Sequence, residues 1–337
     1  MKAVGFDTPG PINAAASLVD FEMPQPLAMG HDLLVAVRAV SVNPVDAKVR
    51  NRFQPEAGMK KVLGYDAAGV VVACGPDVTL FKVGDEVFYA GDLNRPGTNA
   101  EFHLVDERIV GPKPKTLSFA EAAALPLTTI TAWEALFDRI DIRRPLHGVP
   151  PVLLIIGGAG GVGSIAIQLA RRLTDVTVIA TAARSESRDW VHGLGAHHTI
   201  DHAQPMPAQI AALGLAPPSF VFATTHTDQH MAAIVELIAP QGRLCLIDDP
   251  ATLDVKVLKG KSISLHWELM FTRSMFKTPD MIAQHDLLAE ASKLVDDGIL
   301  RTTLAETFGT INATNLKRAH VLLESGTSRG KIVLEGF

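Results

Sequence analysis

The sequence predicts an α/β protein that combines a doubly wound parallel sheet with a separate β-rich domain. Between residues 151 and 266, short apolar segments alternate with segments of helical periodicity, which is typical of a parallel sheet covered on both faces. Before residue 110, strand-like segments are separated by Pro and Gly turns and predict a compact, barrel-like β domain. The 337 residues exceed one ordinary core and indicate two domains.

A glycine-rich turn organises the parallel-sheet domain. Five apolar residues at 152–156 predict a buried strand, the motif G-x-G-x-x-G follows at 158–163, and helical periodicity begins after it. We expect Gly158 to permit the tight turn, Gly160 to let a pyrophosphate approach the backbone, and Gly163 to let helix and strand pack closely. A glycine-rich turn without a ligand is the alternative, but strand, turn and helix together favour dinucleotide binding. The residues expected at the cofactor are Gly158, Gly160, Gly161, Val162 and Gly163.

The other expected elements follow from the same periodicities. Strands of the β domain are expected at 1–6, 32–40, 67–73, 86–89 and 101–105. Strands of the parallel sheet are expected at 152–156, 176–181, 198–200, 220–223, 243–247 and 262–266. Helices are expected at 118–124, 130–137, 164–173, 186–194, 206–213, 228–238, 280–294 and 313–325, with a capping box at Ser118 and Glu121 and an interruption at 125–129. A final strand is expected at 331–334, and because it follows the last two helices it could return to the first domain.

The composition excludes several classes of function. The formal net charge is -5 and the basic residues are scattered, which argues against a nucleic-acid or anionic-membrane partner. Cys74 and Cys245 are the only cysteines, so they provide neither a disulfide framework nor a C-x-x-C metal pair. The N-terminus lacks the apolar core of a signal peptide, and no apolar run approaches the ~18 residues of a membrane span. We therefore expect a cytoplasmic protein.

The end of the second parallel strand indicates the cofactor. A site for NAD usually has an acidic residue there, which binds the ribose 2′-hydroxyl, but Asp175 lies at the opposite end of this strand. The chain instead has Arg184, Ser185 and Arg188, and guanidinium groups suit a 2′-phosphate. A solvated first helical turn with Glu186 is the alternative. The pattern favours NADPH over NADH.

Further cofactor contacts are expected where other parallel strands end, because these ends line one crevice. Thr224 and Thr225 follow the fourth strand, and Asp248 follows the fifth.

Seven stretches spread over nearly the whole chain form a specific combination. They are SVNPVDAKVR (41–50), LGYDAAGVV (63–71), VGDEVFYAG (83–91), AEFHLV (100–105), EAAALPLTTITAWEAL (121–136), GGAGGVG (157–163) and RGKIVL (329–334). Together they resemble the medium-chain dehydrogenase/reductase superfamily, in particular its quinone-oxidoreductase-like branch and the zinc-type alcohol dehydrogenase-like proteins. The resemblance implies a β-rich, chaperonin-10-like catalytic domain at 1–125 and 271–337, a Rossmann dinucleotide-binding domain at 126–270, and a substrate in the cleft. It also implies a homodimer formed through the sixth parallel strand. Apolar Ile263, Leu265 and Trp267 alternate along this edge strand, which suits pairing with a second copy, although an edge strand covered within its own chain would show the same pattern.

The resemblance also implies site residues, and the sequence leaves an ordinary structural role open for each. Asn43 is expected at the nicotinamide and substrate, or in an Asn-Pro turn. Tyr65 is expected to hydrogen-bond a carbonyl or quinone oxygen, or to be an aromatic core residue. Asp46 is expected to relay a proton or to cap a turn. The implied cofactor contacts are Thr128, Thr129 and Lys331. The alternative for the two threonines is a helix kink after Pro126, and the alternative for Lys331 is an ordinary surface lysine.

The zinc ligands of the superfamily are missing from the sequence. Zinc alcohol dehydrogenases have a catalytic Cys where this chain has residues 43–46, and Gly-His-Glu where it has residues 64–66. The stretch 91–99, where a structural zinc loop would lie, contains no Cys. His226 and His230 are spaced for one helix face, but no third ligand is evident. We expect no zinc and no other metal.

These features predict an NADPH-dependent, zinc-independent oxidoreductase that reduces a quinone or an α,β-unsaturated carbonyl, both small-molecule substrates. A zinc-dependent alcohol dehydrogenase or carbonyl reductase is one alternative. A nucleotide-binding sensor or structural protein without turnover is another, since binding and catalysis use different residues.

Overall fold

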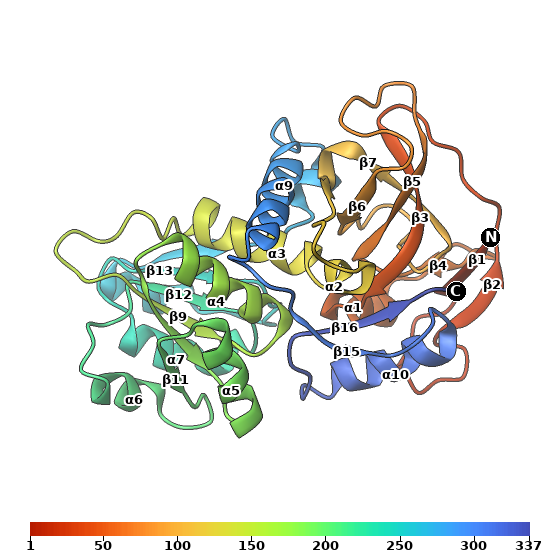
Figure 1. Cartoon of the computed structure of the whole chain (residues 1–337). Coiled ribbons are helices and arrows are strands. Elements are labelled where there is room, and N and C mark those ends of the chain that lie inside the picture. Colours follow the sequence, from red (N-terminus) through yellow and green to blue (C-terminus); the bar gives the residue numbers. More distant parts are fainter. The chain divides into compact units, whose positions relative to one another are not determined.

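The computed structural model describes all 337 residues, and the chain forms two compact units. The first unit comprises Met1–Ile130 and Phe271–Phe337, and the second comprises Thr131–Met270. Both chain termini lie in the first unit (Figure 1). The sequence placed the first boundary between residues 125 and 126, whereas in the structure the first unit extends to Ile130.

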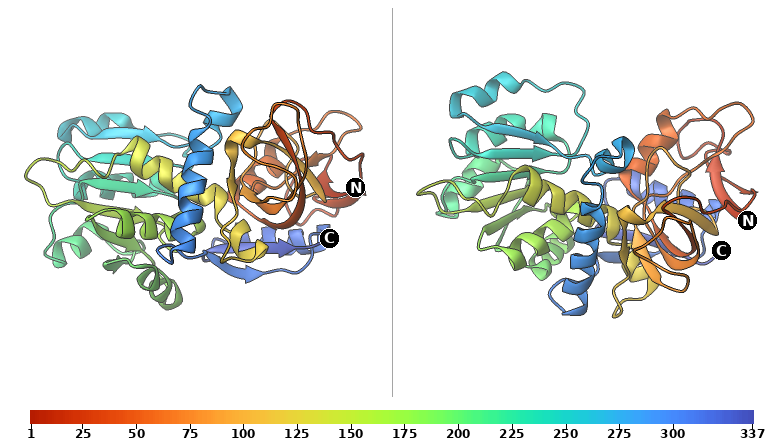
Figure 2. Two further views of the ribbon diagram at one scale, coloured as in Figure 1. Left: turned by 45° about the horizontal axis from the view of Figure 1, so that its top comes forward. Right: turned by 90° about the horizontal axis from the view of Figure 1, so that it is seen from above.

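Two sheets build the first unit. The larger has the strand order β15–β16–β3–β5–β6–β8, with β7 also paired to β3, and the smaller has the order β2–β1–β4. The terminal strand β16 pairs antiparallel with β3, with Val333 opposite Ser41, so the tail returns to this unit as predicted (Figure 2). The strands are β1 (Lys2–Phe6), β2 (Val19–Glu22), β3 (Asp32–Ser41), β4 (Lys61–Val62), β5 (Ala67–Cys74), β6 (Glu86–Tyr89), β7 (Phe102–Asp106), β8 (Val110–Pro112), β15 (Leu304–Thr307) and β16 (Lys331–Glu335).

The helices of the first unit correct two predictions. Residues 44–52, where no helix was expected and an Asn-Pro turn was the alternative role for Asn43, form a helix, because Asn43 is a good N-cap and Pro44 needs no N–H at the first helical position. The interruption expected at 125–129 is confined to Ala124 and Leu125, because Pro126 likewise opens a helix. The helices are α1 (Pro44–Arg52), α2 (Phe119–Ala123), α3 (Pro126–Trp133, which continues into the second unit), α8 (Thr272–Phe276), α9 (Ala283–Asp296) and α10 (Ala313–Glu324).

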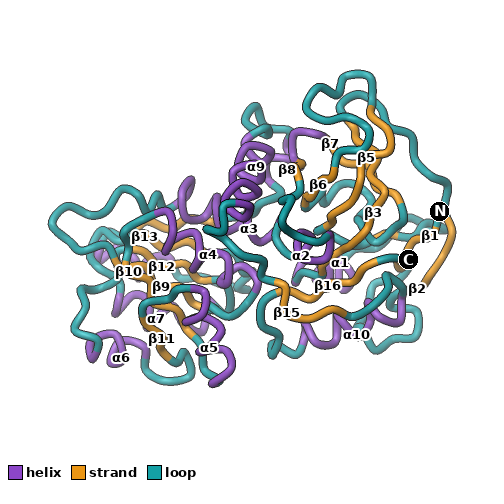
Figure 3. Tube along the Cα trace, in the orientation of Figure 1, coloured by secondary structure: helices purple, strands orange, loops and turns teal.

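The second unit is a parallel sheet with helices along it (Figure 3). The strand order β11–β10–β9–β12–β13–β14 is that of the doubly wound dinucleotide fold, so the predicted fold class is confirmed. The strands are β9 (Val152–Ile156), β10 (Thr177–Thr181), β11 (His198–Ile200), β12 (Phe220–Ala223), β13 (Arg243–Leu246) and β14 (Ser264–Trp267). The helices are α4 (Gly161–Leu173), α5 (Ser185–Leu194), α6 (Met206–Ala212) and α7 (Thr227–Leu237). A π-helical segment, Glu134–Arg139, follows α3 in place of the regular helix expected at 130–137.

Both faces of this sheet are buried. Val152, Leu154 and Ile156 pack with apolar residues of α6 and α7 on one face. Side chains alternate along a strand, so Leu153 and Ile155 point to the other face, and both are fully buried. This explains why β9 is a continuous apolar run rather than an alternating one. No helix in the structure is both long and apolar enough to cross a membrane.

Candidate active site

A buried polar network in the first unit joins Asn43, Asp66 and Lys331. Asn43 Nδ2 donates to Asp66 Oδ2 (2.8 Å), and the Lys331 ammonium donates to the same carboxylate oxygen (2.9 Å). Lys331 also donates to Asn43 Oδ1 and to the Val42 carbonyl. The second oxygen, Asp66 Oδ1, accepts from the Leu127 amide (2.7 Å), which holds the start of α3 to the first unit. The network thus joins α1, β5, α3 and β16, four elements that are distant in sequence.

All polar groups of the network are satisfied. A lysine ammonium has three N–H donors, and Lys331 uses three within its own unit, so it has no free donor for a cofactor phosphate. Burial raises the pKa of the Asp66 carboxyl, and the Lys331 charge partly opposes that rise. Asp66 was not among the residues singled out from sequence, although it follows Tyr65 in the motif and precedes a buried strand.

Asp46 has the geometry of a turn cap. It occupies the third position of α1, where Oδ2 accepts from the Asn43 amide (2.8 Å) and Oδ1 accepts from the Gly64 amide (2.9 Å). Burial raises the pKa of this carboxyl to about 7. Because both oxygens are bonded to backbone, the contacts match the capping alternative rather than a proton relay.

Tyr65, next to the network, has a buried polar group without a hydrogen-bond partner. It is 1% exposed, and its ring packs edge-on against Phe271, with the ring centroids 5.4 Å apart. Its hydroxyl is buried and forms no hydrogen bond. Burial is the main cause that raises the Tyr65 pKa, with the charge of Asp46 next. A buried hydroxyl without a partner is rare in native proteins and indicates a group that awaits a ligand or water.

The two threonines predicted at the cofactor differ in whether their hydroxyl already forms a hydrogen bond. Thr128 donates its hydroxyl to the Leu125 carbonyl one turn earlier (3.1 Å). Thr129 is as buried as Tyr65, and its hydroxyl also has no hydrogen-bond partner. Of the two, only Thr129 therefore keeps a free hydroxyl donor for a ligand.

Zinc does not fit the residues at the superfamily's ligand motif. Asn43 and Asp66 are occupied by the Lys331 ammonium, whose positive charge would repel a dication. Tyr65 supplies a phenol, and neither phenol nor amide belongs to the Cys, His and carboxylate set that zinc takes.

The histidines considered as an alternative metal site are also not arranged as one. His226 precedes α7 in a left-handed conformation (φ +50°), and the His230 ring lies 6.0 Å from that of His202. No group of three or more His, Cys, Asp or Glu side chains in the structure is placed to hold a metal ion.

The glycines of the turn in the second unit have partly different roles from those predicted. The left-handed residue is Gly157 (φ +84°), not Gly158, so Gly157 makes the tight turn. A Cβ on Gly158 would lie 2.8 Å from Ala180 Cβ, and one on Gly163 would collide with the Gly157 carbonyl. Both therefore allow close packing. A Cβ on Gly160 would meet only the Gly157 oxygen, at 3.5 Å, so its surroundings are open.

This turn fits the diphosphate of a dinucleotide. Gly160 is the N-cap of α4, and Gly161 and Val162 are its first residues, with partly exposed backbone. Their amides belong to the first helical turn, whose N–H groups have no partner within the helix and point at an approaching anion.

Comparison with known proteins agrees with both units. The family described as "Alcohol dehydrogenase GroES-like domain" matches residues 29–128, and "Zinc-binding dehydrogenase" matches residues 194–334. A zinc-type alcohol dehydrogenase-like protein of Staphylococcus aureus (strain MRSA252) is 40% identical over 336 residues, which cover 99% of each chain. The chain belongs to the medium-chain dehydrogenase/reductase superfamily. The predictions of this superfamily and of an oxidoreductase are confirmed.

Two solved structures show what this medium-chain dehydrogenase/reductase is similar to. A Rhizobium etli CFN 42 protein, named after the zinc-dependent alcohol dehydrogenases, is 65% identical, with a TM-score of 0.98 over 100% of this chain and 98% of that one. The quinone oxidoreductase of Coxiella burnetii is 29% identical, with a TM-score of 0.80 over 100% of this chain and 99% of that one.

The basic residues after β10 lie at the carboxyl edge of the sheet of this medium-chain dehydrogenase/reductase. Arg184 is the N-cap of α5 and Ser185 is its first residue. Arg188 donates through Nε to the Ala182 carbonyl (3.2 Å) and lies 3.5 Å from Asp201, yet its side chain stays 47% exposed. No acidic residue stands in the turn between β10 and α5. This arrangement suits a 2′-phosphate better than a free ribose hydroxyl.

The other predicted strand-end residues have partners within the unit. Thr224 donates to the Ile156 carbonyl (2.8 Å), and Thr225 bonds the neighbouring His226 ring (2.7 Å). Asp248 accepts from both the amide and the hydroxyl of Thr227, so it caps the start of α7.

Sequence reasoning missed a carboxyl pair in the second unit. Glu134 and Glu268 are buried and close enough for the charge of Glu134 to raise the pKa of Glu268, and Arg139 Nε donates to Glu268 Oε2 (2.7 Å). The two residues stand 134 positions apart in the chain, and each begins an otherwise apolar stretch. No sequence pattern links them.

Proposed function

We propose that this protein is an NADPH-dependent, zinc-independent oxidoreductase that transfers hydride to a quinone or an α,β-unsaturated carbonyl. The observation that carries the proposal is the buried, unpartnered Tyr65 hydroxyl beside a motif position where the Lys331 ammonium neutralises Asp66. The similarity to a quinone oxidoreductase supports the choice of acceptor.

NADPH supplies the hydride when it is bound, and the chain binds and orients it. We assign the diphosphate to the glycine turn and the amides that open α4, and the 2′-phosphate to Arg184, Ser185 and Arg188.

Tyr65 is assigned the hydrogen bond to the acceptor oxygen. Reduction of a quinone or enone adds one hydride and one proton, and electron density moves to the carbonyl oxygen as the hydride arrives. A donor aimed at that oxygen stabilises the transition state. Because burial raises its pKa, Tyr65 keeps its own proton, and water supplies the proton that completes the product.

Asn43, Asp66 and Lys331 are assigned to positioning. Their bonds fix the backbone on both sides of Tyr65: Asn43 Nδ2 lies 3.5 Å from the Tyr65 carbonyl, and Asp66 is the next residue. An ion pair that keeps a nearby polar side chain in place fits a site without a metal.

We also propose a homodimer formed through β14. This strand is an edge of the parallel sheet, and the Trp267 side chain on it is 51% exposed. An unpaired edge with an exposed aromatic residue favours pairing with a second copy. Light scattering of the protein and of Trp267→Lys tests this, and a monomeric parent protein would overturn it.

The experiment that tests the activity measures NADPH oxidation with a panel of quinones and enones, on protein whose zinc content is known. We expect turnover with less than about a tenth of a zinc per chain, and tighter binding of NADPH than of NADH. Activity that requires stoichiometric zinc would identify a zinc-dependent alcohol dehydrogenase or carbonyl reductase instead. Tight NADPH binding without turnover of any acceptor would identify a sensor or structural protein.

A further inference from the structure

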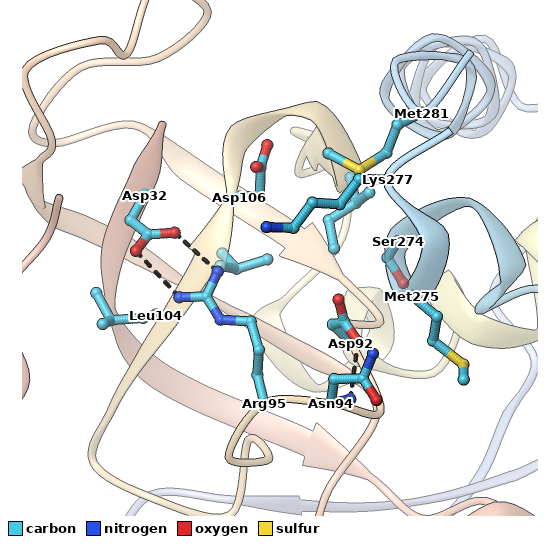
Figure 4. Close-up of a pocket in the computed structure, with 12 residues that line it drawn as sticks. Asp32, Asp92, Asn94, Arg95, Leu104, Asp106, Ser274, Met275, Lys277 and Met281 are labelled. Carbon is cyan, nitrogen blue, oxygen red and sulfur yellow. Dashed lines mark hydrogen bonds and ion pairs between the residues drawn. The ribbon is translucent and has the colours of Figure 1, made fainter. Parts of the chain in front are cut away.

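A cavity of about 500 Å³ lies within the first unit (Figure 4). This volume is in the range of sites that hold small organic molecules. Its walls come from the start of β3, the loop after β6, β7 with the turn that follows it, α8 and the approach to α9. Its apolar lining consists of Leu104, Val105, Ile109, Met275 and Met281.

Two of the three carboxylates at the cavity are paired with a cation. Asp32 accepts two hydrogen bonds from Arg95, at 2.8 and 3.1 Å (Figure 4). Asp106 is held by the Arg108 side chain at 2.9 and 2.7 Å.

The third carboxylate, Asp92, accepts from the Asn94 amide (2.8 Å) and interacts electrostatically with Lys61. Asp32 and Asp106 are thus held in ion pairs, whereas Asp92 forms none.

Lys277 is the exception among the cations, because its ammonium forms neither an ion pair nor a hydrogen bond. Its side chain extends into the cavity, toward the side on which Asp106 and Arg95 lie (Figure 4). Its backbone has φ +46°, at the end of α8, where glycine is the usual residue. The chain thus accepts a left-handed lysine, and Lys277 is the one cation in the cavity lining that has no ion pair.

We propose that this cavity binds a small molecule that carries a carboxylate, with the carboxylate at Lys277 and an apolar body against Leu104, Met275 and Met281. A carboxylate would pair the Lys277 ammonium, the one cation of the lining without an ion pair, whereas a cationic group would be repelled by it. The apolar lining would cover a hydrocarbon chain or ring.

The same wall reaches the candidate active site. Ser274, which lines the cavity, donates to the Phe271 carbonyl (3.1 Å), and the Phe271 ring packs on Tyr65. Asp92, at the cavity, also contributes to the raised pKa of Tyr65. Resting on the proposed function, we infer that the molecule is an acceptor: an α,β-unsaturated carbonyl with a carboxylate remote from the reacting carbon.

The test compares a matched pair of probes, 7-oxo-5-octenoate and its methyl ester, on the full-length protein and on Lys277→Met. Affinity is measured by calorimetry with and without NADPH, and KM by NADPH oxidation. We expect Lys277→Met to weaken binding of the acid about tenfold and to change binding of the ester less than about twofold.

Two further variants keep the test interpretable. Lys277→Gly removes the ammonium and relieves the left-handed backbone, so it is expected to fold well and to lose the same preference for the acid. Lys82→Met removes an 85% exposed lysine outside the cavity and is expected to bind both probes as the parent does.

The outcomes separate the two proposals. A Lys277-dependent preference for the acid in binding, without turnover of either probe, would support the cavity and count against the acceptor role. If the parent protein binds the acid and the ester with equal affinity, or binds neither, the cavity proposal is overturned. Quinone reduction is then decided by its own test.

Discussion

The Lys331 ammonium lies 2.9 Å from Asp66 Oδ2, and both side chains are almost fully buried. Asn43 bonds both partners, and the Leu127 amide bonds the remaining carboxylate oxygen. Such a pair is costly to desolvate, so it is retained only where its hydrogen bonds are complete. Here it joins the last strand of the chain to the segment that carries Tyr65.

Lys331→Met is expected to destabilise the protein by about 3–5 kcal/mol, because it leaves a buried carboxylate without its cation. Denaturant unfolding measures this, with the exposed Lys82→Met expected within about 0.5 kcal/mol of the parent. Adding Asp66→Asn to Lys331→Met removes the unpaired charge and is expected to restore part of the loss. A double variant no better than Lys331→Met alone would show that the ion pair is not the source of the effect.

Tyr65→Phe is expected to separate catalysis from stability. It removes a hydroxyl that forms no hydrogen bond, so unfolding free energy is expected to stay level or rise slightly. Turnover of a quinone or enone is expected to fall about 10²-fold, since the acceptor oxygen loses its donor, while the NADPH dissociation constant stays the same. Loss of stability in step with activity would point to a structural hydroxyl instead.

The sequence predicted most of the fold but less of the candidate site, for a physical reason. Periodicity within one segment is local, so β9 and the final strand β16 were predicted well. The site depends on contacts between distant segments: Lys331 was predicted at the cofactor, yet its three donors are used by its own unit. Asp66 was missed because its partners come from α1, α3 and β16.

Local backbone geometry limited the sequence reasoning in a different way. The glycine motif was found, but its tight turn was assigned to Gly158, although Gly157 is the left-handed residue. Consecutive glycines give no signal about which of them takes the unusual conformation. The helix α1 was missed because Asn-Pro begins both turns and helices.

Alanine at two glycines of the motif is expected to give opposite results. Gly158→Ala places a methyl 2.8 Å from Ala180 Cβ and is expected to destabilise the protein by about 1–3 kcal/mol. Gly160→Ala meets no side chain and is expected to leave stability unchanged, but to weaken NADPH binding because the methyl projects where the diphosphate is assigned. Thermal unfolding and fluorescence titration measure the two effects. Unchanged NADPH affinity in Gly160→Ala would argue against this diphosphate site.

Arg184→Gln tests the preference for the phosphorylated cofactor. If its guanidinium binds the 2′-phosphate, NADPH affinity is expected to fall about tenfold while NADH affinity stays within about twofold. Arg172→Gln, a basic residue in the last turn of α4, is the control and is expected to change neither. A parallel loss of both cofactors in Arg184→Gln would indicate a structural role for this N-cap residue.

Glu134 and Glu268 predict a pH dependence of stability. Burial, together with the charge of Glu134, raises the pKa of Glu268 well above its usual 4.5. The unfolded chain releases this proton near pH 4.5 and the native protein retains it, so folding takes up a proton at higher pH. The stabilisation is therefore fully present below pH 4.5 and is lost as pH rises toward the native pKa, at a limit of about 1.4 kcal/mol per pH unit.

Glu134→Gln removes a charge that raises the pKa of Glu268, so its unfolding free energy is expected to fall less steeply between pH 5 and pH 8 than that of the parent. Urea unfolding at both pH values measures the difference. Glu236→Gln, on the exposed face of α7, is the control and is expected to keep the parent's slope. Equal slopes for Glu134→Gln and the parent would mean that the pair holds no proton above pH 5, and that Arg139 alone neutralises it.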